Sequence, residues 1–203
     1  MENKIAFAVS ALFHPIFMPL YAVIILFNLD FYFANILTTE AKWIIVGLLF
    51  TITVVTPFFL IYMYQRFGII ESYRLDKRED RPLPFITIGS LYYVCFYILK
   101  NLNLPAIIYL VLLSATILVL IAFIINFFWK ISVHTLSIGS IVGLLISLSI
   151  AYQINILFLI LISILISGMV GWARLTMKAH SNLQVYAGFI VGLVFMLTLF
   201  LVL

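Results

Sequence analysis

Charged side chains are scarce in this chain: Lys, Arg, Asp and Glu together make up 9% of its 203 residues. A soluble globular domain carries roughly 25%, so the composition excludes a soluble enzyme and a soluble nucleic-acid-binding protein. Cysteine is scarce as well, and the one residue, Cys95, cannot build a disulfide framework within the chain. Disorder is excluded in turn, because 66% of the residues are hydrophobic and disordered chains are poor in such residues.

What the sequence does contain is a series of long apolar segments. Each is much longer than the roughly 10 residues of a barrel strand, and a membrane-spanning helix needs about 20. We therefore predict an all-α, polytopic helical bundle that forms a single domain over residues 1–203. Seven spans are expected, at residues 6–28, 43–64, 84–99, 105–128, 132–152, 154–172 and 183–203. Six spans are the alternative, because almost nothing separates the fifth segment from the sixth.

The basic residues are distributed unevenly between the two membrane sides that seven spans define. Of the eleven, Lys42 and Lys100 fall on one side. The others fall on the side of the amino terminus and are Lys4, Arg66, Arg74, Lys77, Arg78, Arg81, Lys130, Arg174 and Lys178. An excess of Lys and Arg marks the cytoplasmic side. We therefore expect an integral protein of a bacterial inner (cell) membrane, with this basic side in the cytoplasm.

The same side holds nearly all residues that carry chemistry, in three segments. The first, 71–82, is a loop of mixed charge, and a solvated juxtamembrane loop is the simpler interpretation of it. The second, 129–135, contains His134 near the start of the fifth predicted span. A histidine there can bond to a neighbouring loop, and Ser132 can be an ordinary N-cap.

The third segment, 171–184, contains a histidine and a glutamine four residues apart. If the last helix begins before His180, the two side chains share a helical face. The Gln184 carbonyl can then accept a proton from the ring and fix its tautomer. Arg174 in this segment can instead extend toward lipid head groups. Ionisable groups at membrane depth are costly, so the segment is a candidate for function.

Together the three segments predict one anion site. Guanidinium and ammonium groups match the oxygens of a phosphate, one histidine can attack phosphorus, and the other can protonate the leaving oxygen. The sequence has no acidic cluster, no pair of cysteines and no glycine-rich phosphate loop, so we expect neither a metal nor a cofactor. The third histidine, His14, lies deep in the first span, where we expect it to hydrogen-bond across helices.

At these residues the chain resembles the type 2 phosphatidic acid phosphatase superfamily, the membrane relatives of the vanadium haloperoxidases. The family pattern reads K-x6-R-P, then P-S-G-H, then S-R-x5-H-x3-D. This chain has R-x6-R-P at 74–82, I-S-V-H at 131–134 and A-R-x5-H-x3-Q at 173–184. The blocks keep the order and usual spacing of the family and lie in a motif-bearing core over residues 66–203.

The resemblance implies roles for both histidines of these blocks. His180 would be the nucleophile that forms a phosphohistidine, and His134 would protonate the leaving group and then activate water. Gln184 stands where the family has the aspartate that orients the nucleophile, and Val133 stands where it has glycine. A glutamine can hold the ring, but it brings no charge to stabilise an imidazolium.

The resemblance also implies phosphate-binding side chains, with Arg74 at the position of the family's lysine and Lys77 as a substitute for it. The set is Arg74, Lys77, Arg81, Ser132 and Arg174. We therefore predict a metal-independent phosphoric monoester hydrolase for phosphatidic acid, phosphatidylglycerol phosphate or a polyprenyl pyrophosphate. Its partners would be this lipid substrate and the bilayer, with no nucleic acid, while protein partners and oligomeric state are left open. The alternative, motivated by Gln184 and Val133, is a catalytically degenerate relative that binds phospholipid head groups or serves as a subunit of a membrane assembly.

Overall fold

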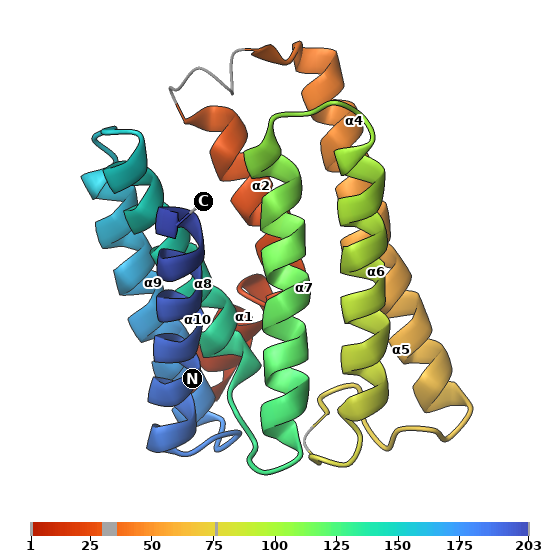
Figure 1. The fold of residues 1–203 in the computed structure, drawn as a ribbon. Helices are drawn as coiled ribbons and strands as arrows, with labels where there is room; N and C mark the ends of the chain where they lie inside the picture. Colours follow the sequence, from red (N-terminus) through yellow and green to blue (C-terminus); the bar gives the residue numbers. More distant parts are fainter. Residues whose placement is uncertain (1, 30–35, 76, 203) are drawn as a thin grey trace. The chain divides into compact units, whose positions relative to one another are not determined.

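The computed structural model describes residues 2–29, 36–75 and 77–202, which are mostly helical and contain no strand (Figure 1). Within these residues, seven segments are long and apolar enough to cross a membrane: Glu2–Asn28, Thr39–Arg66, Pro82–Lys100, Ala106–Asn126, Val133–Ala151, Leu157–Thr176 and Asn182–Val202. The predicted all-α polytopic class and the count of seven are therefore confirmed, and the chain is an integral membrane protein. The predicted end of the last span, residue 203, lies outside the described residues.

Each of the first two spans consists of shorter pieces. The pieces of the first are α1 (Glu2–Leu12), η1 (Pro15–Phe17) and α2 (Met18–Asn28), and those of the second are α4 (Thr39–Leu49), η2 (Phe50–Val55) and α5 (Thr56–Arg66). The other five spans are the continuous helices α6 (Pro82–Lys100), α7 (Ala106–Asn126), α8 (Val133–Ala151), α9 (Leu157–Thr176) and α10 (Asn182–Val202).

The first span is interrupted at His14. A residue that precedes proline is pushed out of the helical region by the proline ring, and His14, which precedes Pro15, is extended with φ −67° and ψ 138°. The short 3₁₀ helix η1 follows, and the Nδ1 atom of His14 accepts a hydrogen bond from the Ile16 N–H at 3.4 Å. Pro15 therefore does more than bend the span, because it creates a non-helical position within it.

The second span contains a π-helical segment, η2, which ends two residues before Pro57. Pro57 has no N–H to donate, and the N–H of Thr56 reaches back to the Thr51 carbonyl, one residue farther than in an α-helix. The hydroxyl groups of Thr51, Thr53 and Thr56 each donate to a helix carbonyl, at 2.8–2.9 Å. These hydroxyls satisfy backbone groups around the irregular turn, as lipid surroundings require.

The described chain divides into two compact units. Unit 1 consists of Met1–Met18 and Trp129–Leu203, and unit 2 of Pro19–Phe128. Unit 1 thus contains α1, η1, α8, α9 and α10, and unit 2 contains α2 from Pro19 onward, α4, η2, α5, α6 and α7. The prediction of a single domain over residues 1–203 stays a prediction.

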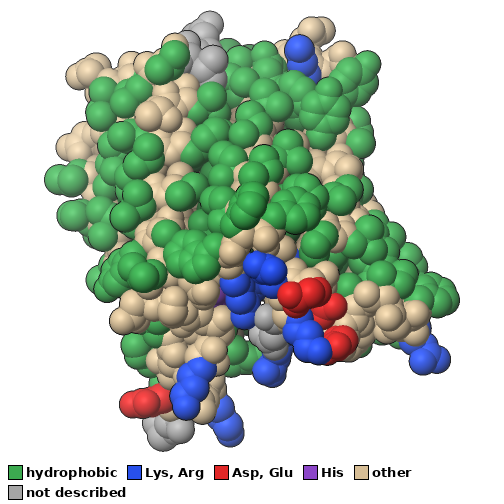
Figure 2. All heavy atoms as spheres, turned by 60° about the horizontal axis from the view of Figure 1, so that its bottom comes forward, with side chains coloured by type: hydrophobic (Ala, Val, Ile, Leu, Met, Phe, Trp, Pro, Cys, Tyr) green, Lys and Arg blue, Asp and Glu red, His purple; other side chains and the backbone are tan. Residues whose placement is uncertain are grey.

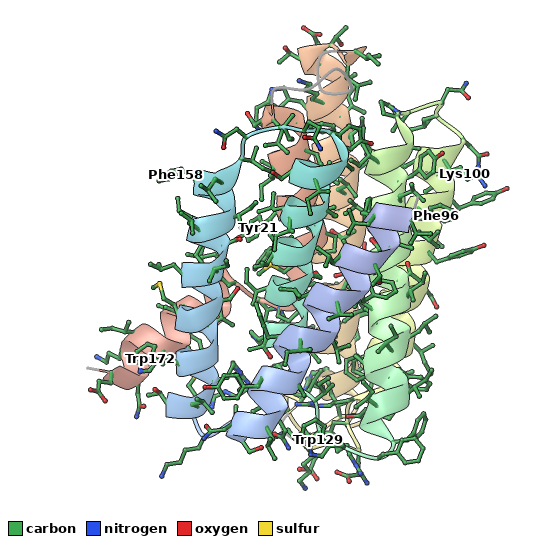
Figure 3. All side chains as sticks on the ribbon, turned by 60° about the vertical axis from the view of Figure 1, so that its left-hand side comes forward. Tyr21, Phe96, Lys100, Trp129, Phe158 and Trp172 are labelled. Carbon is green, nitrogen blue, oxygen red and sulfur yellow. The ribbon has the colours of Figure 1, made fainter. Side chains whose placement is uncertain are left out.

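Within unit 2, α6 packs against α7, and polar side chains join further helices. The Tyr64 hydroxyl of α5 shares a hydrogen bond of 2.8 Å with the Thr87 hydroxyl of α6. The Lys42 ammonium of α4 donates to the Phe27 carbonyl of α2 at 3.3 Å. Lys100, labelled in Figure 3, lies over the Phe96 ring of its own helix, 5.8 Å from the ring centroid.

Within unit 1, α8 and α10 pack backbone against backbone through two pairs of glycines. Each helix carries a G-x-x-x-G sequence: Gly139 and Gly143 in α8, Gly188 and Gly192 in α10. A methyl group added at any of the four would overlap backbone or side-chain atoms of the other helix. Small residues at this spacing let membrane helices approach closely. The close pair α8–α10 is therefore the frame of unit 1.

Replacing Gly192 by alanine is expected to destabilise the protein. The new methyl group would overlap the carbonyl oxygen of Leu136 and lie 2.9 Å from the Ser140 nitrogen, and overpacking of this kind costs about 1–3 kcal/mol. Gly168 of α9 is the matched control, since nothing lies within 4 Å of a methyl group added there. Thermal unfolding in detergent should show a lower midpoint for Gly192→Ala and an unchanged or higher one for Gly168→Ala. Equal midpoints would contradict the backbone contact.

Candidate functional site

The candidate site lies in unit 1, at the end where α8 begins, α9 ends and α10 begins (Figure 1). Ser132 is fully buried and caps α8, with its hydroxyl accepting from the Thr135 N–H at 3.4 Å. Its own N–H donates to the Gln184 carbonyl at 3.3 Å, which ties the start of α8 to the start of α10. The N-cap interpretation of Ser132 is therefore confirmed, while its binding of phosphate stays a prediction.

The connection from α9 to α10 positions His180. Two backbone hydrogen bonds close the end of α9, from Lys178 N–H to the Leu175 carbonyl at 2.9 Å and from Ala179 N–H to the Arg174 carbonyl at 3.1 Å. Lys178 has a left-handed φ of 52°, which turns the chain sharply after the helix. Outside this turn, the Lys130 ammonium donates to the Ala179 carbonyl at 3.1 Å. Lys130 thereby joins the segment before α8 to the residue before His180.

His180 and Gln184 contact each other, but not for the reason the spacing suggested. The condition for a shared helical face, a last helix that begins before His180, is not met, because α10 begins at Asn182, one residue before the start predicted for the last span. Gln184 instead occupies the third position of the helix, and its Oε1 accepts from the Ser181 N–H at 3.1 Å. This Ser-x-x-Gln arrangement is half of a capping box. From there, the same Oε1 lies 3.0 Å from the His180 Nδ1.

The capping contact decides the tautomer of His180. Oxygen and nitrogen of a glutamine amide are interchangeable in electron density, and they are assigned from their partners. The Ser181 backbone N–H can only donate, so the Gln184 atom facing it is the carbonyl oxygen. That oxygen can only accept, so His180 Nδ1 carries the proton. The lone pair of the neutral ring therefore resides on Nε2, in a side chain that is 9% exposed.

A buried arginine lies near the histidines. The Nη1 atom of Arg174 donates to the Ser10 hydroxyl of α1 at 3.1 Å, and both residues are buried. The charge of Arg174 acts on the His134 ring, His180 lies near enough to interact with that ring as well, and His134 bonds to the backbone of Ser10. Unit 1 therefore brings His134, His180 and Arg174 near one another.

His14 is a site residue that sequence reasoning missed. Its ring packs edge-to-face on the His134 ring, with centroids 5.1 Å apart and planes at 86°. The sequence predicts only a hydrogen bond across helices for it. The sequence feature that could have identified it is the His14–Pro15 pair. A residue before proline leaves the helical conformation, so its side chain need not follow the direction of the helix face.

The site lies at the level that tryptophans mark. Trp129 precedes α8 and Trp172 lies in the last turns of α9, and Figure 3 shows both toward the end of unit 1 that carries the site. Both side chains are exposed. Tryptophan is enriched at the membrane–water interface, which is where phosphate head groups of lipids lie.

The remaining predicted residues, Arg74, Lys77 and Arg81, belong to unit 2. Arg81 is buried, and its Nε donates to the Leu75 carbonyl at 2.9 Å. Arg74 is exposed, and Lys77 pairs with Glu71, whose hydrogen bond and charge raise the pKa of the lysine. The role of these three residues in phosphate binding stays a prediction.

Acidic and basic side chains lie next to one another on the face drawn in Figure 2. The loop between α5 and α6 contains such contacts. Lys77 forms an ion pair with Glu71, and the Glu71 N–H donates to the Asp80 carboxylate at 3.3 Å. The Asn126 amide of α7 donates to the Arg78 carbonyl at 3.0 Å and fastens the loop to the helix. These contacts stay within the loop and its neighbouring helix.

Among the described residues, no group of three or more His, Cys, Asp and Glu side chains could hold a metal ion. Comparison with protein-family models, with curated proteins and with solved structures finds no match to this chain. The chemistry of the site is therefore argued from its own geometry.

Proposed function

We propose that the protein is a membrane lipid phosphatase that works through a phosphohistidine on His180. The observation that carries the proposal is the grouping of His180, His134 and Arg174 in unit 1, with the lone pair of His180 assigned to Nε2. A ring with a fixed tautomer is a competent nucleophile, and a buried guanidinium stabilises charge on a transferring phosphoryl group. The three motif blocks resemble the type 2 phosphatidic acid phosphatases and assign the same roles.

The reaction would proceed in two steps. In the first, Nε2 of His180 attacks phosphorus, the bond from phosphorus to the leaving oxygen breaks, and His134 gives that oxygen a proton. In the second, His134 takes a proton from water, the hydroxide attacks phosphorus, and the bond to Nε2 breaks. Inorganic phosphate and an alcohol are released from a monoester, and two phosphates would be separated in a polyprenyl pyrophosphate. No cofactor is required for either step.

The position of the site supports a lipid substrate. Trp129 and Trp172 mark the level of the lipid head groups, and the spans present an apolar surface to the acyl chains. Phosphatidic acid, phosphatidylglycerol phosphate and a polyprenyl pyrophosphate all combine an apolar acyl or isoprenoid chain with a terminal phosphate. We further propose that the membrane is a bacterial inner membrane and that the site faces the cytoplasm, on the strength of the basic residues at that end.

A second function, head-group binding without turnover, is favoured by the way polar groups in the site are already engaged. Arg174 donates to Ser10, and the Gln184 oxygen serves the cap of α10. Glutamine also supplies no negative charge to a phosphohistidine. Under this alternative the protein would bind phosphatidic acid without releasing phosphate from it.

Purified protein in detergent, with EDTA present, is expected to release phosphate from at least one of the three lipids. With a ³²P-labelled substrate and an alkaline quench, the protein should carry a label that acid removes, because phosphohistidine is acid-labile. Binding of phosphatidic acid without release or label would support the head-group function. Absence of both release and binding would overturn the proposed site.

The same assay locates the site. Dioctanoyl phosphatidic acid is charged and does not cross a bilayer, so we expect inverted membrane vesicles to hydrolyse it and intact spheroplasts not to, relative to membranes without the protein. Hydrolysis by spheroplasts would place the site on the outer face.

A further inference from the structure

The break in the first span delivers two residues to the site that no motif block contains. Ser10 is in the last turns of α1, and His14 follows the helix in an extended conformation. The short helix η1 after the break packs against α8. The first span therefore contacts the first turn of α8, which contains His134.

The ring of His14 is held by the backbone of its own turn. Its Nδ1 accepts from the Ile16 N–H at 3.4 Å, and a backbone N–H can only donate, so the proton of the neutral ring is on Nε2. The ring of Pro15, the next residue, fixes its own φ and so stiffens the turn. The hydrogen bond to Ile16 and the stiff turn therefore restrict the movement of the His14 ring.

The contact between the two rings has a defined geometry. Their centroids are 5.1 Å apart and their planes are at 86°. Edge-to-face arrangements at this separation are favourable for aromatic rings. The His134 ring also bonds to the backbone of Ser10. Two contacts from the first span thus restrict the rotation of the His134 side chain.

We propose that His14 is a positioning residue for His134, which it holds in the orientation that proton transfer requires. The inference rests on the proposed function, in which His134 exchanges a proton with the leaving group and with water. Such transfer needs a heavy-atom separation of about 2.6–3.2 Å, and a ring that turns loses this geometry. His14 acts through the His134 ring and touches neither the phosphoryl group nor the leaving oxygen.

Two substitutions separate the cap from the ring. His14→Asn keeps an acceptor for the Ile16 N–H, because asparagine is among the best N-caps, but it removes the ring. His14→Phe keeps an edge-to-face partner for His134 and removes the acceptor. If His14 positions His134, His14→Asn lowers kcat about 10- to 100-fold with KM within threefold, a loss typical of a misplaced group. His14→Phe should retain kcat within about threefold.

A second measurement does not depend on turnover. In protein with ¹³C-labelled histidine rings, in nanodiscs, relaxation of the His134 ring carbons reports the order of that side chain. The order should fall in His14→Asn and persist in His14→Phe. Gly168→Ala is the control for a substitution elsewhere in the unit, since nothing lies within 4 Å of the added methyl group. If His134 order responds in this way but no variant or unsubstituted protein releases phosphate, the proposed function fails and the positioning role stands.

Two results would overturn the proposal. The first is unchanged order of the His134 ring in His14→Asn, whatever the activity. The second is loss of activity in His14→Phe with normal activity in His14→Asn, since this pattern assigns the cap, and not the ring, as the contribution of His14.

Discussion

Replacing His180 by asparagine is expected to reduce phosphate release at least about 10⁴-fold, the scale of losing a catalytic nucleophile, and to remove the acid-labile label. The asparagine N–H can take the place of Nδ1, which now lies 3.0 Å from Gln184 Oε1. The turn between α9 and α10 should therefore keep its shape. What the variant lacks is a nitrogen lone pair that can attack phosphorus, because the amide nitrogen only donates.

Two further variants sharpen the test. Lys178→Ala removes an exposed cation two residues earlier, and it should keep both release and label. His180→Ala removes the bond to Gln184 as well as the nucleophile, so comparing it with His180→Asn separates folding from chemistry. Phosphate release by His180→Asn at the rate of the unsubstituted protein would exclude His180 as the nucleophile, whichever lipid is used.

The class of fold followed from composition because lipid imposes a simple rule. In lipid every backbone group must be hydrogen-bonded within the protein, which leaves helices and closed barrels, and the apolar runs are much longer than barrel strands. The interruptions were harder to predict. Proline is a common cause of helix kinks, but here one proline follows an extended position at His14 and another follows a π-helical turn in the second span.

The contact of His180 with Gln184 was predicted only on the condition that the last helix begins before His180, and it forms although α10 begins at Asn182. Spacing of four residues suggested a shared helical face, whereas the contact arises because Gln184 is in the capping position of α10. The signal was present in the sequence as Ser181 followed three residues later by glutamine, a known helix-start pattern. That pattern predicts the direction of the Gln184 side chain, which the spacing of four residues alone does not.

The contribution of the first span could not be predicted from local patterns. Ser10 contacts Arg174 across 164 positions of sequence, and serine is common in membrane helices for many reasons. The approach of α8 and α10 also required the fold, since each G-x-x-x-G becomes informative only when Gly139 is known to face Phe189 and Gly192 to face Leu136. Contacts of this kind depend on which helices become neighbours.

Gln184 should determine both the tautomer of His180 and its reactivity. Its Oε1 accepts two hydrogen bonds, from Ser181 N–H and from His180 Nδ1. Leucine has a similar size and no acceptor, so Gln184→Leu leaves the ring without a fixed tautomer. In the serine-protease triad a change that gives the wrong tautomer costs about 10⁴ in rate. We expect Gln184→Leu to lower phosphate release about 10²- to 10⁴-fold, and the loss of the cap to lower stability by roughly 1 kcal/mol.

The conservative variants distinguish geometry from charge. Gln184→Glu keeps the length and both acceptor contacts and adds a negative charge beside His180, which stabilises a positively charged phosphohistidine, so release should equal or exceed that of the unsubstituted protein. Gln184→Asp carries the same charge on a side chain shorter by one methylene group, and it should fall between glutamine and leucine because it cannot reach both donors. An Asp variant faster than the Glu variant would mean that the cap geometry is unimportant. Equal rates for Gln184→Leu and the unsubstituted protein would show that the ring needs no partner at Nδ1.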